Sequence, residues 1–591
     1  MKFLLTAMNA KYIHSNLAVY SLRGYAKMHG IQAELAEYTI NHQMEMILEQ
    51  LYRRKPDVLF FSCYIWNIEY VKELAEELGR LCPEMAIWVG GPEVSFETSA
   101  FLQQNPAITG ILIGEGEETF LELCRLYETK QSVKAEADGD ETIRWDEAMS
   151  QIRGIAFRDC RGEIRHTVPR ELLSMDAIPF CYEEMEDFAN RIVYYESSRG
   201  CPYACSYCLS SVDKRLRFRS LELVLSELQF FIDRKVPQVK FVDRTFNCKH
   251  EHAMAIWRYL AEHDNKVTNF HFEISADLLS QEEIDFVATM RPGLIQFEIG
   301  VQTVNERTIK EIRRTMYLER LAECVAQIRS AGNIHQHLDL IAGLPYEDFE
   351  SFGHSFDVVY EMEPQQLQLG FLKVLKGSYM FEHAKEYGLL YRRKPPYEVL
   401  STSWISYEEL LELKLVEEVL EMHYNSGQFV RSLAILNQHF DRPFELYLQL
   451  GRFYLKKGYR GQNYSRMRRS EIFLEFALSV DEKRASLYKQ ALTFDLYARE
   501  NVKSRPSWSA KEDTIDKKAQ LRFLRQDGKD KKYCHLEYFS AEFLEEVSAM
   551  VEVHGWTKDQ KDLQGGWLLF DYENRDPLTN EAMITFVGDV L

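Results

Sequence analysis

Three cysteines lie within eight residues of one another, at Cys201, Cys205 and Cys208. Thiolates on one short loop can each bind one iron of a [4Fe–4S] cluster, and complete ligation by the protein would take a fourth cysteine. The fourth iron would stay open, as in a catalytic metal site. Two other interpretations compete with this iron–sulfur site. The cysteines could pack as small apolar residues, or they could bind structural zinc, for which a fourth ligand at finger spacing is missing. We predict an open iron–sulfur site.

Strands and helices alternate around this loop, which follows the first of six apolar runs directly. The alternation predicts a partial (β/α)6 TIM-like barrel over residues 191–400, with functional groups at the carboxyl ends of its strands. The predicted strands are Ile192–Glu196, Val239–Val242, Phe270–Ile274, Leu294–Val301, Ile334–Ile341 and Leu367–Val374.

The segment from Ser197 to Cys208, with Tyr207 just before the third cysteine, resembles the radical S-adenosylmethionine (SAM) superfamily. Three later segments resemble strand motifs of the same family: Phe241–Asn247, Phe297–Thr303 and Leu340–Pro345. The resemblance implies that the three cysteines hold the cluster and that SAM chelates its open iron. It also implies a set of residues that contact SAM: Tyr207, Asp243, Glu273, Glu298, Gln302 and Arg314.

Four of these assignments depart from the family or have an alternative. Asp243 stands where the family often has a Gly-Gly-Glu element. Glu273 and Glu298 are equally well explained as paired carboxylates inside the barrel. For Arg314, which would pair with the SAM carboxylate, the alternative is a solvated helix face.

Residues 1–135 contain five short apolar strands separated by amphipathic helices, which predicts a flavodoxin-like, Rossmann-type domain. Two glycine motifs follow its fourth and fifth strands and resemble the cobalamin-binding domains fused ahead of radical SAM barrels. Glycine allows backbone to approach a flat corrin. The implied cobalamin contacts are Ser62, Gly90, Gly91, Pro92, Glu93, Gly114, Glu115 and Gly116.

The family's Asp-x-His-x-x-Gly element is absent, so we expect no histidine below cobalt. His14, after the first strand, lacks that context and is better explained as an ordinary polar histidine.

The other segments are organised as follows. A polar stretch at 130–145 predicts a loop, and 152–168 predicts a hairpin within a bridging linker, 136–190. Residues 401–591 predict a mainly helical domain that ends in a hairpin at Trp567–Phe586.

Composition narrows the class of protein. The chain has 591 residues, 46% of them hydrophobic, and a net charge of −20, which is unlike a nucleic-acid binder with a basic surface. A basic and aromatic segment at 452–469 predicts a solvated helix face or a site for an anionic substrate, and we do not expect RNA as a partner. Eleven cysteines in this length are no disulfide scaffold. No apolar run approaches the roughly 18 residues of a membrane span, so we expect a cytoplasmic protein without a membrane partner.

The resemblances imply a cobalamin-dependent radical SAM enzyme that methylates an unactivated carbon of an unknown small molecule. A low-potential donor such as a flavodoxin or ferredoxin would supply electrons. The alternatives are a radical rearrangement, cyclisation or oxidation with the same cofactors, a non-enzymatic redox or cobalamin sensor, and a closed structural metal domain. Because both folds bind ligands at strand carboxyl ends, we expect loops 201–208, 90–93 and 114–117 to border one cavity, with Asp243 and Gln302 on its SAM side.

Overall fold

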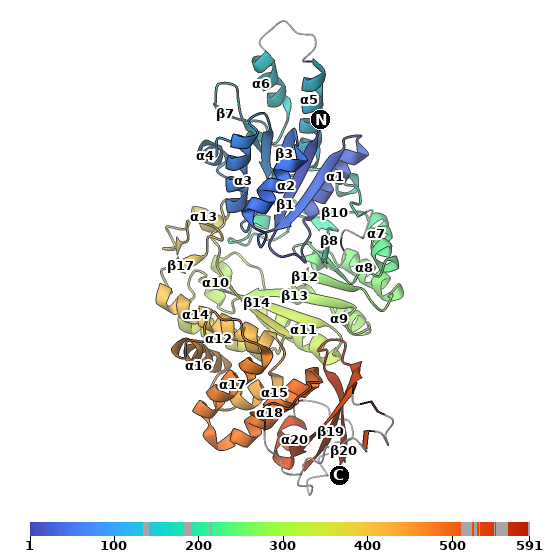
Figure 1. Cartoon of the computed structure of the whole chain (residues 1–591), viewed down its shortest axis with the longest axis vertical. Helices are drawn as coiled ribbons and strands as arrows, with labels where there is room; N and C mark the ends of the chain where they lie inside the picture. The colour runs from blue at the N-terminus through green and yellow to red at the C-terminus, as the bar shows by residue number, and fades with distance from the viewer. Residues whose placement is uncertain are drawn as a thin grey trace.

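Three parts follow one another along the long axis of the computed structural model (Figure 1): an N-terminal α/β domain, a central sheet with helices, and a C-terminal region. The structure describes residues 1–133, 141–182, 188, 191–212, 215–509, 523–524, 529–530, 532–548, 550 and 565–588.

The N-terminal domain is built on a seven-stranded sheet of order β2-β1-β3-β4-β5-β6-β7. Its first five strands are parallel, and their order, 2-1-3-4-5, is the flavodoxin-like order that the sequence predicts. These strands are β1 (Phe3–Asn9), β2 (Ala33–Thr39), β3 (Val58–Ser62), β4 (Ala86–Gly90) and β5 (Gly110–Leu112).

Helices cover both faces of this sheet, because successive residues of the apolar strands point to opposite sides. In β1, Leu4 packs into one core with Leu74 of a helix on that side, whereas Phe3 packs into another core with Phe120. The helices are α1 (Leu17–Met28), α2 (Met44–Arg54), α3 (Ile68–Leu81), α4 (Thr98–Gln104), α5 (Glu117–Val133) and α6 (Glu141–Gln151).

Two predictions for this region need correction. The loop predicted at 130–145 is wrong at both ends, because α5 continues to Val133 and α6 begins at Glu141; residues 134–140 lie outside the described residues. The predicted hairpin exists as β6 (Ile155–Arg158) and β7 (Ile164–His166). However, β6 pairs antiparallel with β5, so the hairpin extends the N-terminal sheet and is not a separate bridge.

The central part is a six-stranded, all-parallel sheet whose spatial order, β15-β14-β13-β12-β11-β8, follows the chain. This is the open partial barrel that the sequence predicts. Its strands are β8 (Val193–Tyr195), β11 (Gln238–Phe241), β12 (Asn269–Ile274), β13 (Ile295–Gln302), β14 (His335–Ala342) and β15 (Gln366–Phe371).

One face of the barrel sheet packs under helices and the other is polar. In β13, Ile295, Phe297 and Ile299 are buried, whereas the intervening Gln296 and Glu298 are only partly buried on the opposite face. The helices between the strands are α7 (Leu221–Asp233), α8 (His250–Glu262), α9 (Gln281–Val287), α10 (Glu306–Glu311), α11 (Leu318–Ala331) and α12 (Phe349–Glu361). The polar face is therefore the face available to ligands.

Beyond the barrel lie α13 (Tyr379–Glu382) and the short paired strands β16 (Leu390–Tyr391) and β17 (Val399–Ser401). The helices that follow are α14 (Tyr407–Leu420), continued by a π-helical turn at Glu421–Asn425, α15 (Val430–Asn437), α16 (Pro443–Lys456), α17 (Arg466–Val480) and α18 (Ala485–Arg499). The chain then forms β18 (Cys534–Ser540), α20 (Ala541–Ser548), β19 (Gly565–Arg575) and β20 (Ala582–Gly588).

The predicted helical region and final hairpin are both present, and β18 adds a third antiparallel strand to the hairpin. No helix within the described residues is long and apolar enough to span a membrane.

Candidate functional site

The cysteine loop lies between two short antiparallel strands, β9 (Ser198–Arg199) and β10 (Arg217–Phe218). Gly200 leads into it at φ +103°, and a Cβ there would lie 2.4 Å from the Arg215 carbonyl oxygen, so only glycine fits this crossing. Inside the loop, the backbone N–H of Ser206 donates to Ile312 (2.9 Å) and its carbonyl accepts from Met380 (2.9 Å). The loop is thus fixed from two sides.

Two of the three thiols are buried, at Cys201 and Cys205, and Cys208 is half-buried. Burial raises the pKa of the Cys205 thiol; the charges of Cys201 and Cys208 raise it further, and Arg314 opposes them. The three thiols are therefore close enough to act on one another, and a metal cluster would favour their deprotonated forms. This donor set fits an iron–sulfur cluster.

Cys248 is another cysteine near this loop, although it is distant from it in the sequence. It lies close enough to Cys201 for that thiol's charge to add to burial in raising the Cys248 pKa to about 11. The sequence gives no sign that Cys248 and Cys201 are close, because they are far apart along the chain; the fold brings them together.

A cavity opens beside Cys205 at the carboxyl ends of the barrel strands. Of the six predicted SAM contacts, Glu273, Glu298, Gln302 and Arg314 line it. The complete lining is Tyr203, Cys205, Arg244, Thr245, Glu273, Ile274, Ser275, Glu298, Gly300, Gln302, Arg314, Thr315 and Asp339.

Three side chains of this lining have polar atoms without a hydrogen-bond partner among the described residues. Two of them, Gln302 Oε1 and Arg314 Nε, belong to residues predicted to contact SAM, and the third is Asp339 Oδ1. Arg314 is held in place by donating to the Gly300 carbonyl and, at 3.4 Å, to the Tyr207 hydroxyl. A buried donor and a buried acceptor that lack partners cost free energy unless a ligand or water satisfies them. Their position fits a polar ligand such as SAM.

Asp243 hydrogen-bonds to the chain just before the cysteine loop. Its carboxylate is buried and accepts from the Ser197 amide (3.0 Å), the Ser197 hydroxyl (2.7 Å) and the Ser198 hydroxyl (2.6 Å). Burial raises its pKa to about 6, although these hydrogen bonds oppose that shift. Asp243 is not among the residues that line the cavity. With both oxygens occupied, it fixes the chain just before the cysteine loop.

The first N-terminal glycine motif packs against the protein itself. Gly91 has φ +117°, and a Cβ there would lie 2.5 Å from the Cys63 carbonyl oxygen. From the sequence we explain this glycine by the close approach of a corrin. The structure gives a second reason, because the Cys63 backbone leaves no room for a side chain at this position. After it, Pro92 is exposed and Glu93 is buried, where its carboxylate accepts from the Tyr397 hydroxyl. Ser62, at the end of β3, accepts from Asn16 at 3.2 Å.

The second glycine motif is open on one side. Gly114 has φ +79° and a Cβ there would meet nothing within 4 Å, whereas Gly116 packs against Leu22. Glu115, between the two glycines, accepts from Arg217 and from the Leu173 amide (3.3 Å). This loop presents open backbone at the carboxyl edge of the sheet, which fits the close approach of a flat ligand.

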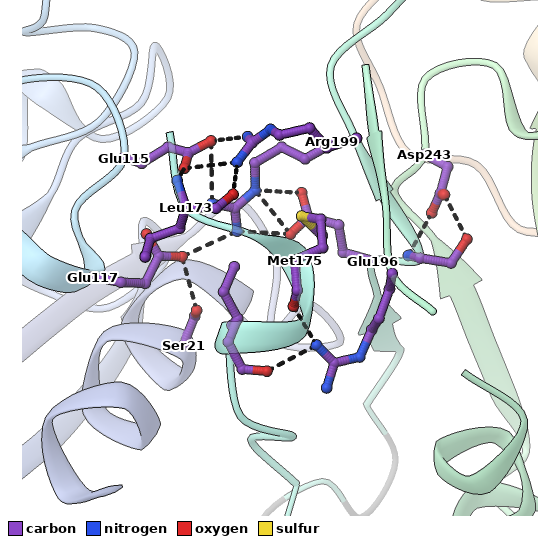
Figure 2. A network of polar contacts seen from close by, with 12 residues as sticks. Ser21, Glu115, Glu117, Leu173, Met175, Glu196, Arg199 and Asp243 are labelled. Carbon is purple, nitrogen blue, oxygen red and sulfur yellow. Dashed lines mark hydrogen bonds and ion pairs between the residues drawn. The ribbon is translucent and has the colours of Figure 1, made fainter. Parts of the chain in front are cut away.

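Ion pairs join this second loop to the cysteine loop (Figure 2). Arg199, two residues before Cys201, donates to Glu117 at 3.0 Å and to Glu196 at 2.8 Å, and lies 3.5 Å from Glu115. Glu117 also accepts from Ser21 at 3.0 Å. Although burial would raise the Glu117 pKa, the charge of Arg199 holds it below its ordinary value.

Sequence reasoning missed this network. The acidic residues within the glycine motif, beside an arginine adjoining the cysteine motif, were the available signal. The cavity beside Cys205 does not confirm the predicted cavity shared by loops 201–208, 90–93 and 114–117. No residue of loops 90–93 and 114–117 is among those that line it. Contacts from the N-terminal loops reach the barrel through Arg199, Arg217 and Tyr397 instead.

Family models match the chain in three places. A B12 binding domain covers residues 4–124, the radical SAM superfamily covers 195–359, and a protein of unknown function, DUF4080, covers 385–560. The chain therefore carries a B12 binding domain followed by a radical SAM domain, as the motifs predict.

Several proteins are similar to it. The cobalamin-dependent radical SAM methyltransferase TokK of Streptomyces tokunonensis is 27% identical over 310 residues, which are 50% of this chain and 44% of TokK. The anaerobic magnesium-protoporphyrin IX monomethyl ester cyclase of Cereibacter sphaeroides is 21% identical over 372 residues, 58% of this chain and 54% of the cyclase. The chain thus spans about half the length of these curated relatives.

A solved structure of the cobalamin-dependent S-adenosylmethionine radical enzyme OxsB, with aqua-cobalamin and S-adenosylmethionine bound, superposes with a TM-score of 0.58 at 16% identity. The match covers 83% of this chain and 78% of OxsB, so the fold is shared well beyond the two domains named above.

Proposed function

We propose that this protein is a cobalamin-dependent radical SAM enzyme that methylates an unactivated carbon of a small molecule. The observation that carries the proposal is the ion-pair network that joins Glu115 and Glu117, in the loop after β5, to Arg199 beside the cysteine loop. We propose that this network holds the cobalamin-binding edge of the N-terminal sheet against the SAM-binding edge of the barrel sheet. Reacting groups gain rate when they are held close in a fixed orientation.

In this proposal Cys201, Cys205 and Cys208 hold a [4Fe–4S] cluster, and SAM binds in the cavity beside Cys205. When bound, the cluster supplies an electron for the cleavage of SAM, and cobalamin carries the methyl group. Arg314 forms a charge-assisted pair with the SAM carboxylate, and the Gln302 side chain accepts from its polar groups. Both have unpartnered polar atoms at the cavity, which supports these roles.

Cobalamin binds at the carboxyl edge of the N-terminal sheet, over Gly114 and the exposed Pro92, where backbone is accessible. Electrons come from a low-potential donor such as a flavodoxin or ferredoxin. We propose a cytoplasmic location, because a reducing compartment suits this chemistry.

The test is anaerobic purification and reconstitution, followed by SAM cleavage under strong reduction and a screen for consumed metabolites. A product heavier by one CH2 group supports methylation. The triple Cys201/Cys205/Cys208→Ala variant should lose iron, sulfide and the visible cluster absorption, whereas Cys160→Ala should keep them. Full retention of iron in the triple variant contradicts the cluster assignment, and absence of saturable cobalamin binding contradicts the cobalamin assignment.

A second candidate is cyclisation or oxidation with the same cofactors, which the similarity to the cyclase favours. A product that lacks the added CH2 group would support it.

A further inference from the structure

The inner face of the barrel carries a row of charged and imidazole side chains below the cavity. Adjacent strands place Glu298 of β13 beside His337 of β14, and Asp339 follows two residues later on the same face. One donor atom from each of these three side chains lies within 4.8 Å of the others. They form a cluster of mixed nitrogen and oxygen donors outside the cysteine site.

Two of the donors face each other without a hydrogen bond. His337 is only 9% exposed, and its Nε2 lies 3.0 Å from Asp339 Oδ1. Nevertheless, neither atom has a hydrogen-bond partner within the part of the chain that the structure describes. Such a separation is also that of two donors about 2.1 Å from one metal ion at roughly right angles. The buried imidazole thus faces the Asp339 carboxylate at ion-pair distance but without hydrogen-bond geometry.

Glu298 is held ionised from its other side. Lys240 Nζ lies 2.8 Å from Glu298 Oε2, and His271 Nε2 lies 2.9 Å from the same oxygen. No hydrogen bond among the described residues engages the second oxygen, Oε1. Groups that orient a carboxylate in this way are the usual outer partners of metal ligands.

We propose that Glu298, His337 and Asp339 bind one divalent transition-metal ion, such as Mn²⁺, Fe²⁺ or Zn²⁺. Mixed imidazole and carboxylate ligands suit these ions. Glu298 and Asp339 also line the cavity beside Cys205, so three protein ligands leave positions of the ion open toward it. If the proposed function holds, these positions take a carboxylate or phosphate oxygen of the substrate.

The site is tested with Mn²⁺ alone on the cluster-reconstituted full chain. Free Mn²⁺ is measured by electron paramagnetic resonance during a titration, and Zn²⁺ is then added as competitor. We expect one saturable Mn²⁺ per chain that Zn²⁺ displaces. The His337→Gln/Asp339→Asn variant should weaken binding by at least about 100-fold, since loss of outer partners alone costs 10–100-fold.

The matched control is Glu282→Gln, which removes an exposed carboxylate from the same barrel and should keep the wild-type affinity. Cluster absorption and thermal unfolding show whether each variant is folded, and either single substitution serves if the double variant is not. No saturable binding by the wild type, or unchanged binding in the folded variants, overturns the site. Neither result affects the cluster absorption or SAM cleavage, which test the proposed function separately.

Discussion

Glu273 and Glu298 lie side by side on adjacent strands, yet their surroundings shift their ionisation in opposite directions. Burial raises the pKa of Glu273 to about 7, and Arg244, 3.9 Å away, only partly offsets it. Burial alone would also raise the Glu298 pKa, but the contacts of His271 and Lys240 lower it well below its usual range. One carboxyl therefore titrates near neutral pH, and the other stays charged.

This difference predicts a pH-dependent effect of Glu273→Gln on stability. The folded pKa of about 7 lies above the ordinary value of 4.5, so the stability that Glu273 contributes is present below pH 4.5 and lost as the pH rises through 7. The Glu273→Gln variant has no carboxyl group at this position, so it does not lose this stability as the pH rises. Its free energy of unfolding relative to wild type should rise with pH, approaching about 3 kcal/mol above pH 7. Urea unfolding at pH 5 and pH 8 measures the gap.

The control for this prediction is Glu282→Gln, because the Glu282 side chain is 61% exposed and is expected to give the same gap at both pH values. A gap for Glu273→Gln that narrows from pH 5 to pH 8 would contradict the burial argument.

At the scale of elements, the two glycine motifs look alike in sequence but differ in what surrounds them. A side chain at Gly91 would meet the Cys63 backbone, whereas one at Gly114 would meet open space. Gly91→Ala should therefore destabilise the N-terminal sheet by about 3 kcal/mol, from strain and overpacking together. Gly114→Ala should cost about 1 kcal/mol, from its positive φ alone. Hydrogen exchange of the β3 and β4 amides, followed by mass spectrometry, measures both.

Comparable losses in the two variants would show that φ, and not the contact with Cys63, decides the cost. The comparison also matters for cobalamin: Gly114 substitutions test the approach of a corrin, whereas Gly91 substitutions disturb the sheet itself.

The sequence predicted the parallel strands well because their residues are apolar and bounded by turns. Phe270–Ile274, for example, was predicted as a strand, and β12 extends from Asn269 to Ile274. Helix ends, and contacts between residues that are distant in the sequence, were harder to predict. The polarity of residues 130–145 resembles that of a loop, but α5 and α6 are helices that extend into it. The same holds for the site: the family resemblance pointed to Gln302 and Arg314, which line the cavity, whereas the serines that bind Asp243 follow from the path of the chain before Cys201.

At the scale of the whole molecule, the basic segment 452–469 has charges that pair with nearby acids. The basic segment 452–469 faces acids on neighbouring helices: Arg452 pairs with Glu412 at 2.7 Å and Arg460 with Glu418 at 3.2 Å. Lys457 likewise lies 2.5 Å from Glu475. These pairs support a solvated helix face, because their charges are already compensated within the protein.

The contacts between the N-terminal domain and the barrel are instead buried or partly buried. Tyr397 donates to the buried Glu93, and His14 lies 2.6 Å from the Tyr194 hydroxyl, which gives His14 an ordinary polar partner. The Arg199 network is a further contact, in which the Glu117 side chain is 5% exposed and the Arg199 side chain 22%. Buried pairs of this kind are costly to break.

Arg199→Met tests whether this network holds the two domains together. The substitution keeps much of the side-chain volume but leaves Glu117 and Glu196 without their guanidinium, and an uncompensated buried charge costs about 3–5 kcal/mol. The loop 114–117 should then exchange its amide hydrogens faster, together with residues 198–199 and 217–218, whereas α16 should be unchanged. Arg80→Met is the control, because Arg80 is 72% exposed in its pair with Glu77 and its loss should cost at most about 1 kcal/mol. Unaltered exchange at 114–117 in the Arg199 variant would mean that Tyr397 and His14 suffice to hold the domains, and that the proposed alignment of the two ligand-binding edges does not depend on the ion pairs.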